Sequence, residues 1–202
     1  MATSLCEHLI ASDIQFDCDD LVQRGLEADG VIINRADIDF GSVVFSENNP
    51  NIIETLPLKS GKKGYAVHQL GNTPFTGAQS TLNVGTYRNT WTHEIPIAVL
   101  ANTPAVARDI IDPLSNGQFV LVLKNRNHGA DGSAKYQIYG YNQGLVASEG
   151  TEEKYSEDTD GGWLITLQEA SAPKSAIFLF KTDEKASDAL FESLKTAATS
   201  KA

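Results

Sequence analysis

The chain has 202 residues, of which 41% are hydrophobic and 21% charged, and its formal net charge is −10. This length suits one domain with a substantial core, and the composition is ordinary for a globular protein. The sequence has no apolar run near the roughly 20 residues of a membrane helix, and its acidic balance argues against a protein that neutralises the phosphates of a nucleic acid.

Residues 1–30 are predicted to form an N-terminal arm. Ser4 and Glu7 have the spacing of a capping box, which favours a short helix through Ile10. The acidic stretch that follows is interpreted as a poorly packed arm or loop. Because the start has neither a basic region nor a long apolar core, we expect no secretory signal and a protein made in a cytoplasm.

Cys6, Cys18 and a cluster of aspartates in this arm raise the question of a metal. The two cysteines lack the paired spacing of a zinc site, and a disulfide between them stays open, although a reduced pair suits a cytoplasm. An EF-hand loop needs an oxygen ligand where this sequence has Leu21, so a solvated acidic loop is favoured over an irregular calcium site. The aspartates are Asp17, Asp19 and Asp20.

Residues 31–101 carry several strand candidates. Between residues 64 and 70 the side chains of Tyr65, Val67 and Gln69 alternate with their neighbours, as on the two faces of a strand. Residues 71–80 are predicted to form an extended loop. Residues 81–101 are predicted to form two strands, in which Pro96 requires an edge or a bulge.

A short central helix is predicted over residues 103–115. Thr103 can cap its start, Pro104 suits the first helical position, and Pro113 is expected to end it. Four or more strands separated by glycine-marked turns follow over residues 118–181.

The last predicted element is an amphipathic helix over residues 182–198, capped by Thr182. A helix within a strand-rich chain indicates an α+β fold that is mainly β. We expect an antiparallel β-sandwich or barrel over residues 31–202, with a short central helix and this C-terminal helix.

Candidate catalytic groups are few. No G-x-S-x-G signature supports a nucleophile, and SGKKG at residues 60–64 lacks the spacing of a phosphate-binding loop. The histidines are expected to be ordinary hydrogen-bonded side chains. We therefore expect neither an enzyme nor a bound cofactor; the histidines are His8, His68, His93 and His128.

An acidic run near residues 147–162 admits two interpretations. Like charges so close together extend a segment, and such runs are most often a solvated hairpin loop. The functional alternative is a charged loop that lines a channel or faces a neighbouring subunit. Its carboxylates are Glu149, Glu152, Glu153, Glu157, Asp158 and Asp160, and Lys154 contributes one positive charge among them.

The order of segments resembles the virion structural proteins of tailed bacteriophages that infect Bacteroidetes, and the plan is similar to that of phage major tail tube proteins. The segments that carry the resemblance are GYAVHQL, LNVGTYRNTWTHEIPIAVLANTP, FVLVLKN, KYQIYGYNQGL, GGWLITLQE and PKSAIFLF. The resemblance implies a self-assembling subunit. Six copies would form a ring, rings would stack, and DNA would pass through the bore without specific binding.

The same resemblance implies where functional residues lie. The acidic run would line the lumen or a subunit interface, and Asp17, Asp19 and Asp20 would sit on an arm between rings. Its implied partners are other copies of the chain and other virion tail proteins, in a virion assembled in the host cytoplasm, with no membrane contact. A negative lumen would let DNA slide, although acidic charge is more often explained by solubility alone.

Two alternatives stay open at this stage. Within the structural class, the chain could be a head–tail connector or a capsid decoration protein. From another class, it could be a carbohydrate-binding β-sandwich, although strand aromatics are more often part of a core. The aromatic platforms in that case would be Trp91, Trp163, Tyr139 and Tyr141.

Overall fold

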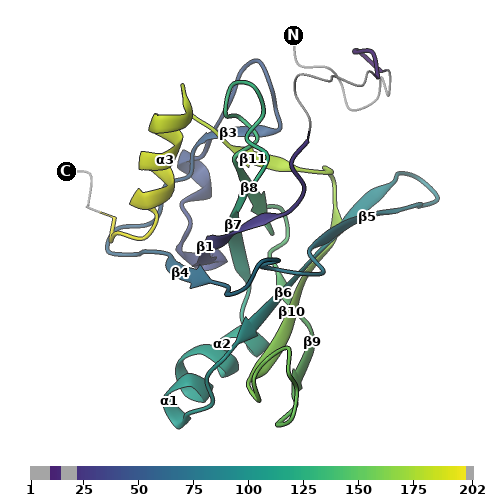
Figure 1. Ribbon diagram of the computed structural model, residues 1–202. Coiled ribbons are helices and arrows are strands. Elements are labelled where there is room, and N and C mark those ends of the chain that lie inside the picture. The colour runs from purple at the N-terminus through teal and green to yellow at the C-terminus, as the bar shows by residue number, and fades with distance from the viewer. Residues whose placement is uncertain (1–9, 15–21, 199–202) are drawn as a thin grey trace.

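The computed structural model describes residues 10–14 and 22–198. The helix predicted from Ser4, both cysteines and the three arm aspartates Asp17, Asp19 and Asp20 lie outside the described residues. Strands make up 37% of the chain and helices 16%, in two sheets with a short central helix and a C-terminal helix (Figure 1). This confirms the predicted α+β, mainly β class.

The larger sheet has seven strands in the order β2-β3-β11-β8-β7-β1-β4. Its pairs are antiparallel except β3 with β11, which run parallel. The strands are β1 (Leu26–Asn34), β2 (Val44–Phe45), β3 (Ile52–Thr55), β4 (Tyr65–His68), β7 (Phe119–Asn125), β8 (Tyr136–Tyr139) and β11 (Ile177–Leu179).

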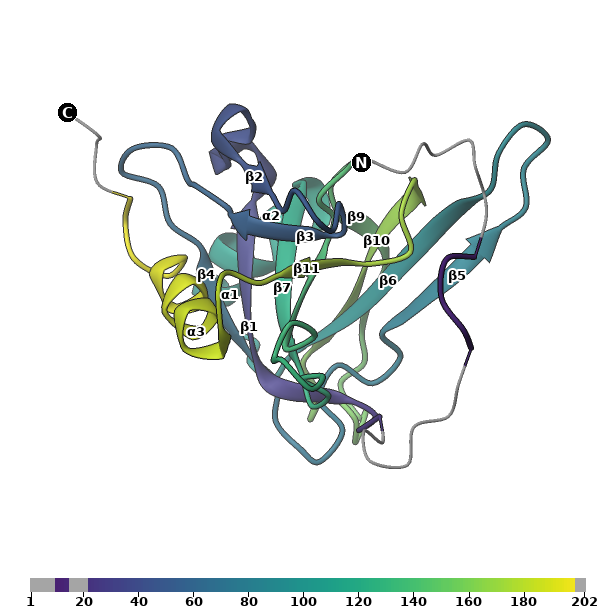
Figure 2. The ribbon, with the colours of Figure 1, turned by 90° about the horizontal axis from the view of Figure 1, so that it is seen from above.

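The smaller sheet has four antiparallel strands in the order β5-β6-β10-β9. They are β5 (Gln79–Asn83), β6 (Thr90–Val99), β9 (Val146–Glu152) and β10 (Trp163–Ala172). The β5–β6 hairpin extends away from the body of the molecule in both views (Figures 1 and 2).

Strand β7 separates two apolar layers. Val120 and Val122 face one layer, which helix α3 (Glu184–Ser193) covers with Phe191. Leu121 and Leu123 face the other layer, which the four-stranded sheet covers. Because both faces are covered, residues 119–123 are all buried, and this explains the uninterrupted apolar sequence FVLVL.

Strand β1 begins at Leu26, before the predicted end of the arm at residue 30. Asp29 and Gly30 have the composition of a turn, but both pair with β4. A Cβ atom at Gly30 would lie 2.5 Å from Cδ2 of Leu123. Gly30 is therefore required by the close approach of β1 to β7 rather than by a turn.

The central helical segment begins as predicted. Thr103 accepts a hydrogen bond from the Val106 amide and Pro104 occupies the first turn of α1 (Pro104–Val106). The expectation that Pro113 ends the helix is wrong, because a π turn over residues 107–111 is followed by α2 (Asp112–Asn116). Pro113 lies in the first turn of that new segment, where its missing N–H costs no hydrogen bond.

Two further sequence predictions concern single residues. Asp183, not Thr182, caps α3 through a hydrogen bond from the Ala186 amide. Pro96 does lie at an edge, because pairing of β5 with β6 ends at Glu94. Beyond that point the Gln69 amide group replaces the missing strand by bonding to both backbone groups of Ala98.

Candidate functional site

The outer face of the four-stranded sheet carries a band of polar side chains, interrupted by the outward residues Pro96, Val146 and Leu164. In the central strands β6 and β10 the buried side chains point to the core, and their neighbours point away from it. The cross-strand pairs place these outward residues side by side. We call this surface the outer face. Its polar members are Gln79, Thr81, Thr92, Glu94, Glu149, Thr151, Thr166 and Gln168, and Pro96, Val146 and Leu164 lie among them.

Amide and carboxylate groups link the strands across this surface. Gln79 donates to Oε2 of Glu94 at 2.6 Å, and Gln168 donates to Oε1 of the same carboxylate at 2.7 Å. Asn83 donates to the Thr92 hydroxyl at 2.6 Å. The hydrogen bonds from Gln79 and Gln168 lower the pKa of Glu94, so this carboxylate is ionised at neutral pH.

The four strands of this sheet contain neither lysine nor arginine. Glu94 and Glu149 lie on the outer face, Glu152 ends β9, and Glu169 points into the core. The outer face is therefore weakly negative, and it is polar except at Pro96, Val146 and Leu164. A surface of this kind offers no cation to a phosphate group.

The acidic run is not one loop. Glu149 and Glu152 belong to strand β9, where they pair with Thr166 and Trp163 of β10. Strand β9 forms because it pairs with β10, whose apolar alternation is strong. The charge pattern of β9 alone did not indicate a strand. The remaining predicted residues lie in the β9–β10 loop, and they are Glu153, Glu157, Asp158 and Asp160, all exposed.

Two of these acidic residues have local structural roles. Glu152 accepts hydrogen bonds from Asn102 and Lys154, and the bond from Lys154 is the main reason that its pKa is lowered. Asp160 has a φ of 49°, a backbone conformation that aspartate tolerates better than most residues. Glu149 is the member of the acidic run that the structure places on the outer face.

The aromatic side chains proposed as sugar platforms are packed into the protein. Tyr139 is 7% exposed and contacts the ring of His93. Tyr141 meets Phe45 edge to face. The indole nitrogen of Trp163 is buried and has no hydrogen-bond partner among the described residues. Trp91 is half-buried. These contacts suit a core, not an open stacking platform.

The described histidines form ordinary polar contacts. His68 lies 2.7 Å from Asp29, and His93 lies 2.7 Å from the Ser80 hydroxyl and 3.2 Å from the Lys174 carbonyl. His8 is outside the described residues. Among the described residues, no group of three or more His, Cys, Asp or Glu side chains could hold a metal ion.

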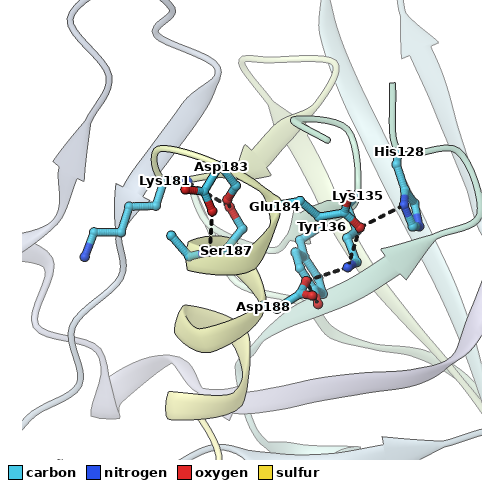
Figure 3. A network of polar contacts seen from close by, with 9 residues as sticks. His128, Lys135, Tyr136, Lys181, Asp183, Glu184, Ser187 and Asp188 are labelled. Atoms are coloured by element: carbon cyan, nitrogen blue, oxygen red, sulfur yellow. Dashed lines mark hydrogen bonds and ion pairs between the residues drawn. The ribbon is translucent and has the colours of Figure 1, made fainter. Parts of the chain in front are cut away.

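A second polar cluster joins α3 to the loop before β8 (Figure 3). Lys135 is 7% exposed in its side chain and lies 2.7 Å from Glu184 and 2.5 Å from Asp188. Tyr136 donates to Asp188 at 2.8 Å, and His128 lies 3.2 Å from Glu184. The cluster contains side chains that enzymes use, but each is occupied in anchoring the helix.

The pKa directions in this cluster agree with an anchoring role. Burial disfavours the charge on Lys135, but hydrogen bonds to Asp188 and Glu184 outweigh it and raise the pKa of this ammonium group. Burial would raise the pKa of Asp188, but bonds from Lys135 and Tyr136 lower it. A lysine that stays charged is a poor nucleophile at neutral pH.

Acid is expected to weaken the attachment of α3. The pKa of Glu184 is also lowered, chiefly by Lys135. The ordinary pKa is 4.5 for Glu184 and 3.8 for Asp188. A carboxylate whose pKa is lowered by folding stabilises the fold fully when the pH is above its ordinary pKa. This stability is lost as the pH falls through the lowered pKa. We expect urea unfolding to show that Lys135→Met destabilises the protein more at pH 7 than at pH 3. Equal losses at the two pH values would contradict this assignment.

Comparisons with protein-family models, curated proteins and solved structures gave no match for this chain. Among the helices that the structure describes, none has the length and apolar character to cross a membrane.

Proposed function

We propose that this protein is a structural subunit, the major tail tube protein of a tailed phage, which assembles into rings through the edges of its four-stranded sheet. The observation that carries the proposal is the combination of two open edges with a cation-free outer face. Strand β5 is exposed along its whole length, and within the described chain β5 and β9 each have a strand neighbour on one side only.

The edge strands have directions that allow the sheet to continue from one copy to the next. In an antiparallel sheet with four strands, the first and last strands run in opposite directions. Strand β9 of one copy can therefore pair with β5 of the next and continue the antiparallel ladder. Repetition of this contact would satisfy the exposed backbone groups at both edges of the four-stranded sheet, which otherwise favour uncontrolled aggregation.

A ring of six copies would have a wide bore. Six sheets of four strands make twenty-four strands, and barrels of about 16–18 strands already enclose an aqueous channel. With the apolar core on one side of each sheet, the outer face would line that channel. Its threonines, amides and carboxylates would present no positive charge to DNA, so DNA would slide through it without being held.

The rival functions make different use of the same surfaces. A head–tail connector or decoration protein would expose similar edges but assemble only on a partner. A carbohydrate-binding module would need aromatic platforms open to solvent, and the four candidate aromatics are packed or half-buried. The geometry thus favours assembly over sugar binding.

The oligomeric state tests the proposal directly. We expect mass photometry and negative-stain microscopy of the purified full chain to show rings of uniform width, and tubes as concentration rises. A monomer at every concentration would contradict self-assembly and favour a connector or decoration protein.

Cysteine cross-linking can identify the edges that meet. In a background with Cys6→Ser and Cys18→Ser, we expect Thr81→Cys on β5 and Thr151→Cys on β9 to form disulfides between copies under mild oxidation, because both edges face one another across the joint. A panel with Gln79→Cys and Glu149→Cys would cover neighbouring registers. Val44→Cys, on an edge of the other sheet, is the control, and equal cross-linking there would refute edge pairing between β5 and β9.

A further inference from the structure

The β5–β6 hairpin ends in a tip that presents two exposed large apolar side chains, Val84 and Tyr87, to solvent. Tyr87 is 100% exposed, Val84 is 84% exposed and Leu82 is 45% exposed. The tip has its own internal order, because the Gly85 amide donates to the Asn89 side chain, and a Cβ atom at Gly85 would lie 2.4 Å from the Arg88 carbonyl. An exposed tyrosine on an ordered tip is typical of an interaction surface.

An apolar cleft of about 1010 Å³ opens between β4, the end of β6 and the π turn. Several large apolar side chains at this cleft are exposed, including Leu70 at 69%, Leu100 at 46% and Ile110 at 41%. Its floor includes Ile97 and Val99, and the Asp158 carboxylate lies at its border. The cleft is large enough to accept an aromatic side chain, and much of its lining is apolar.

The tip and the cleft lie at opposite ends of strand β6. The tip precedes Thr90, whereas Ile97 to Leu100 line the cleft, so the two features are about 30 Å apart along a strand of this length. One copy cannot therefore fill its own cleft. Two complementary surfaces at opposite ends of one subunit produce a head-to-tail contact that repeats along an axis.

Charge supports the same pairing. The Arg88 guanidinium on the tip has no ion-pair partner among the described residues. Asp158 at the cleft likewise has no described partner, while Asp109 is already bonded to Arg108. Arg88 of one copy and Asp158 of the next would therefore complement each other at the rim of the contact.

We propose that the tip of the β5–β6 hairpin of one copy, with Tyr87 as its anchor, docks into the β4–β6 cleft of another copy. This contact rests on the proposed function and deepens it. The pairing of β5 with β9 joins neighbouring copies within a ring, whereas the tip contact joins copies end to end in the direction of β6. In a tube, it would connect one ring to the next.

Tyr87→Ala tests the role of Tyr87 in the contact between copies. The substitution should not change the stability of the fold, because this side chain has no described packing contact. We expect the concentration needed for tubes to rise at least tenfold, with rings unchanged. The matched control is Val44→Ala, since Val44 is 48% exposed but belongs neither to the tip nor to the lining of the cleft. Tubes that form at the wild-type concentration, or an equal effect of the two substitutions, would overturn the proposal.

Photocross-linking tests the contact even if no ring forms. The full chain with p-benzoylphenylalanine at position 87 should cross-link between copies to residues 97–100 or 108–110, as identified by mass spectrometry. Cross-links to other surfaces would refute the cleft as the receptor. A charge exchange adds a second check: Arg88→Asp should weaken the contact, and Asp158→Arg in the same chain should restore it.

These outcomes separate the two proposals. Tubes lost with rings intact support the tip contact and retain the tail tube function. Cross-linked head-to-tail chains without any ring support the tip contact but contradict the ring.

Discussion

Glu169→Ala is expected to lower the free energy of unfolding by about 3–4 kcal/mol, because it removes a buried acceptor of two backbone hydrogen bonds. Glu169 is 2% exposed. Its carboxylate accepts from the Gly140 amide at 3.0 Å and from the Gln143 amide at 2.7 Å. The substitution leaves both N–H groups without their acceptor, and it leaves a cavity.

This carboxylate connects the two sheets. Glu169 lies on β10 of the smaller sheet, whereas Gly140 and Gln143 form the turn after β8 of the larger sheet. Gly140 has a φ of 80°, and a Cβ atom there would lie 2.6 Å from the Phe119 carbonyl. The turn has little freedom to find another partner, so the loss is not relieved by local rearrangement.

Urea unfolding at a concentration where the protein is monomeric measures the effect, since assembly would otherwise add to the apparent stability. Glu149→Gln is the control, because Glu149 is exposed on the same sheet, and we expect a change within about 0.5 kcal/mol. Glu169→Gln keeps one acceptor oxygen, so it should lower the free energy of unfolding by less than Glu169→Ala does. A loss as small as that of the control would show that the two amides do not depend on Glu169.

Short-range patterns predicted much of the fold. Alternation predicted the strand at residues 65–68, and a threonine followed by proline predicted the start of the helix at residue 104. The apolar stripe predicted the C-terminal helix, which covers Glu184–Ser193 and not the whole of residues 182–198, and Phe191 is buried on it. Each of these signals depends on residues within one or two turns of one another, so the sequence displays it directly.

Long-range pairing could not be predicted in the same way. Strand β11 enters the larger sheet between β3 and β8, and its parallel contact with β3 joins residues more than 120 positions apart. Local periodicity carries no information about which strands become neighbours. For the same reason the outer face was not predicted, because Gln79, Glu94 and Gln168 come together only through three paired strands.

The candidate site shows the same division. The acidic run was visible as composition, but charge alone did not separate the strand residue Glu149 from loop residues such as Glu157. The polar residue with the clearest structural role, Glu169, was not singled out, because its partners belong to a turn of the other sheet. A carboxylate at an inward position of an otherwise apolar alternation was the signal that could have identified it.

Phe191→Ala is expected to cost about 3–5 kcal/mol, the usual range for loss of a buried phenylalanine. Phe191 is 2% exposed, and its ring stacks on Tyr136 with centroids 4.5 Å apart. The same tyrosine donates its hydroxyl to Asp188 one turn earlier on α3. Removal of the ring therefore weakens both the apolar and the polar attachment of the helix.

Helix α3 covers the face of the larger sheet that lies opposite the four-stranded sheet, so its loss should expose one core layer and spare the other. Hydrogen exchange should then show lost protection in α3 and in the segment near Gly64, whose amide donates to the Leu194 carbonyl. Amides of β6 and β10 should keep their protection under native conditions. Lys185→Ala, on the exposed side of α3, is the matched control. If protection falls equally in both sheets, α3 is not a separately attached layer but part of a single cooperative unit with the outer face.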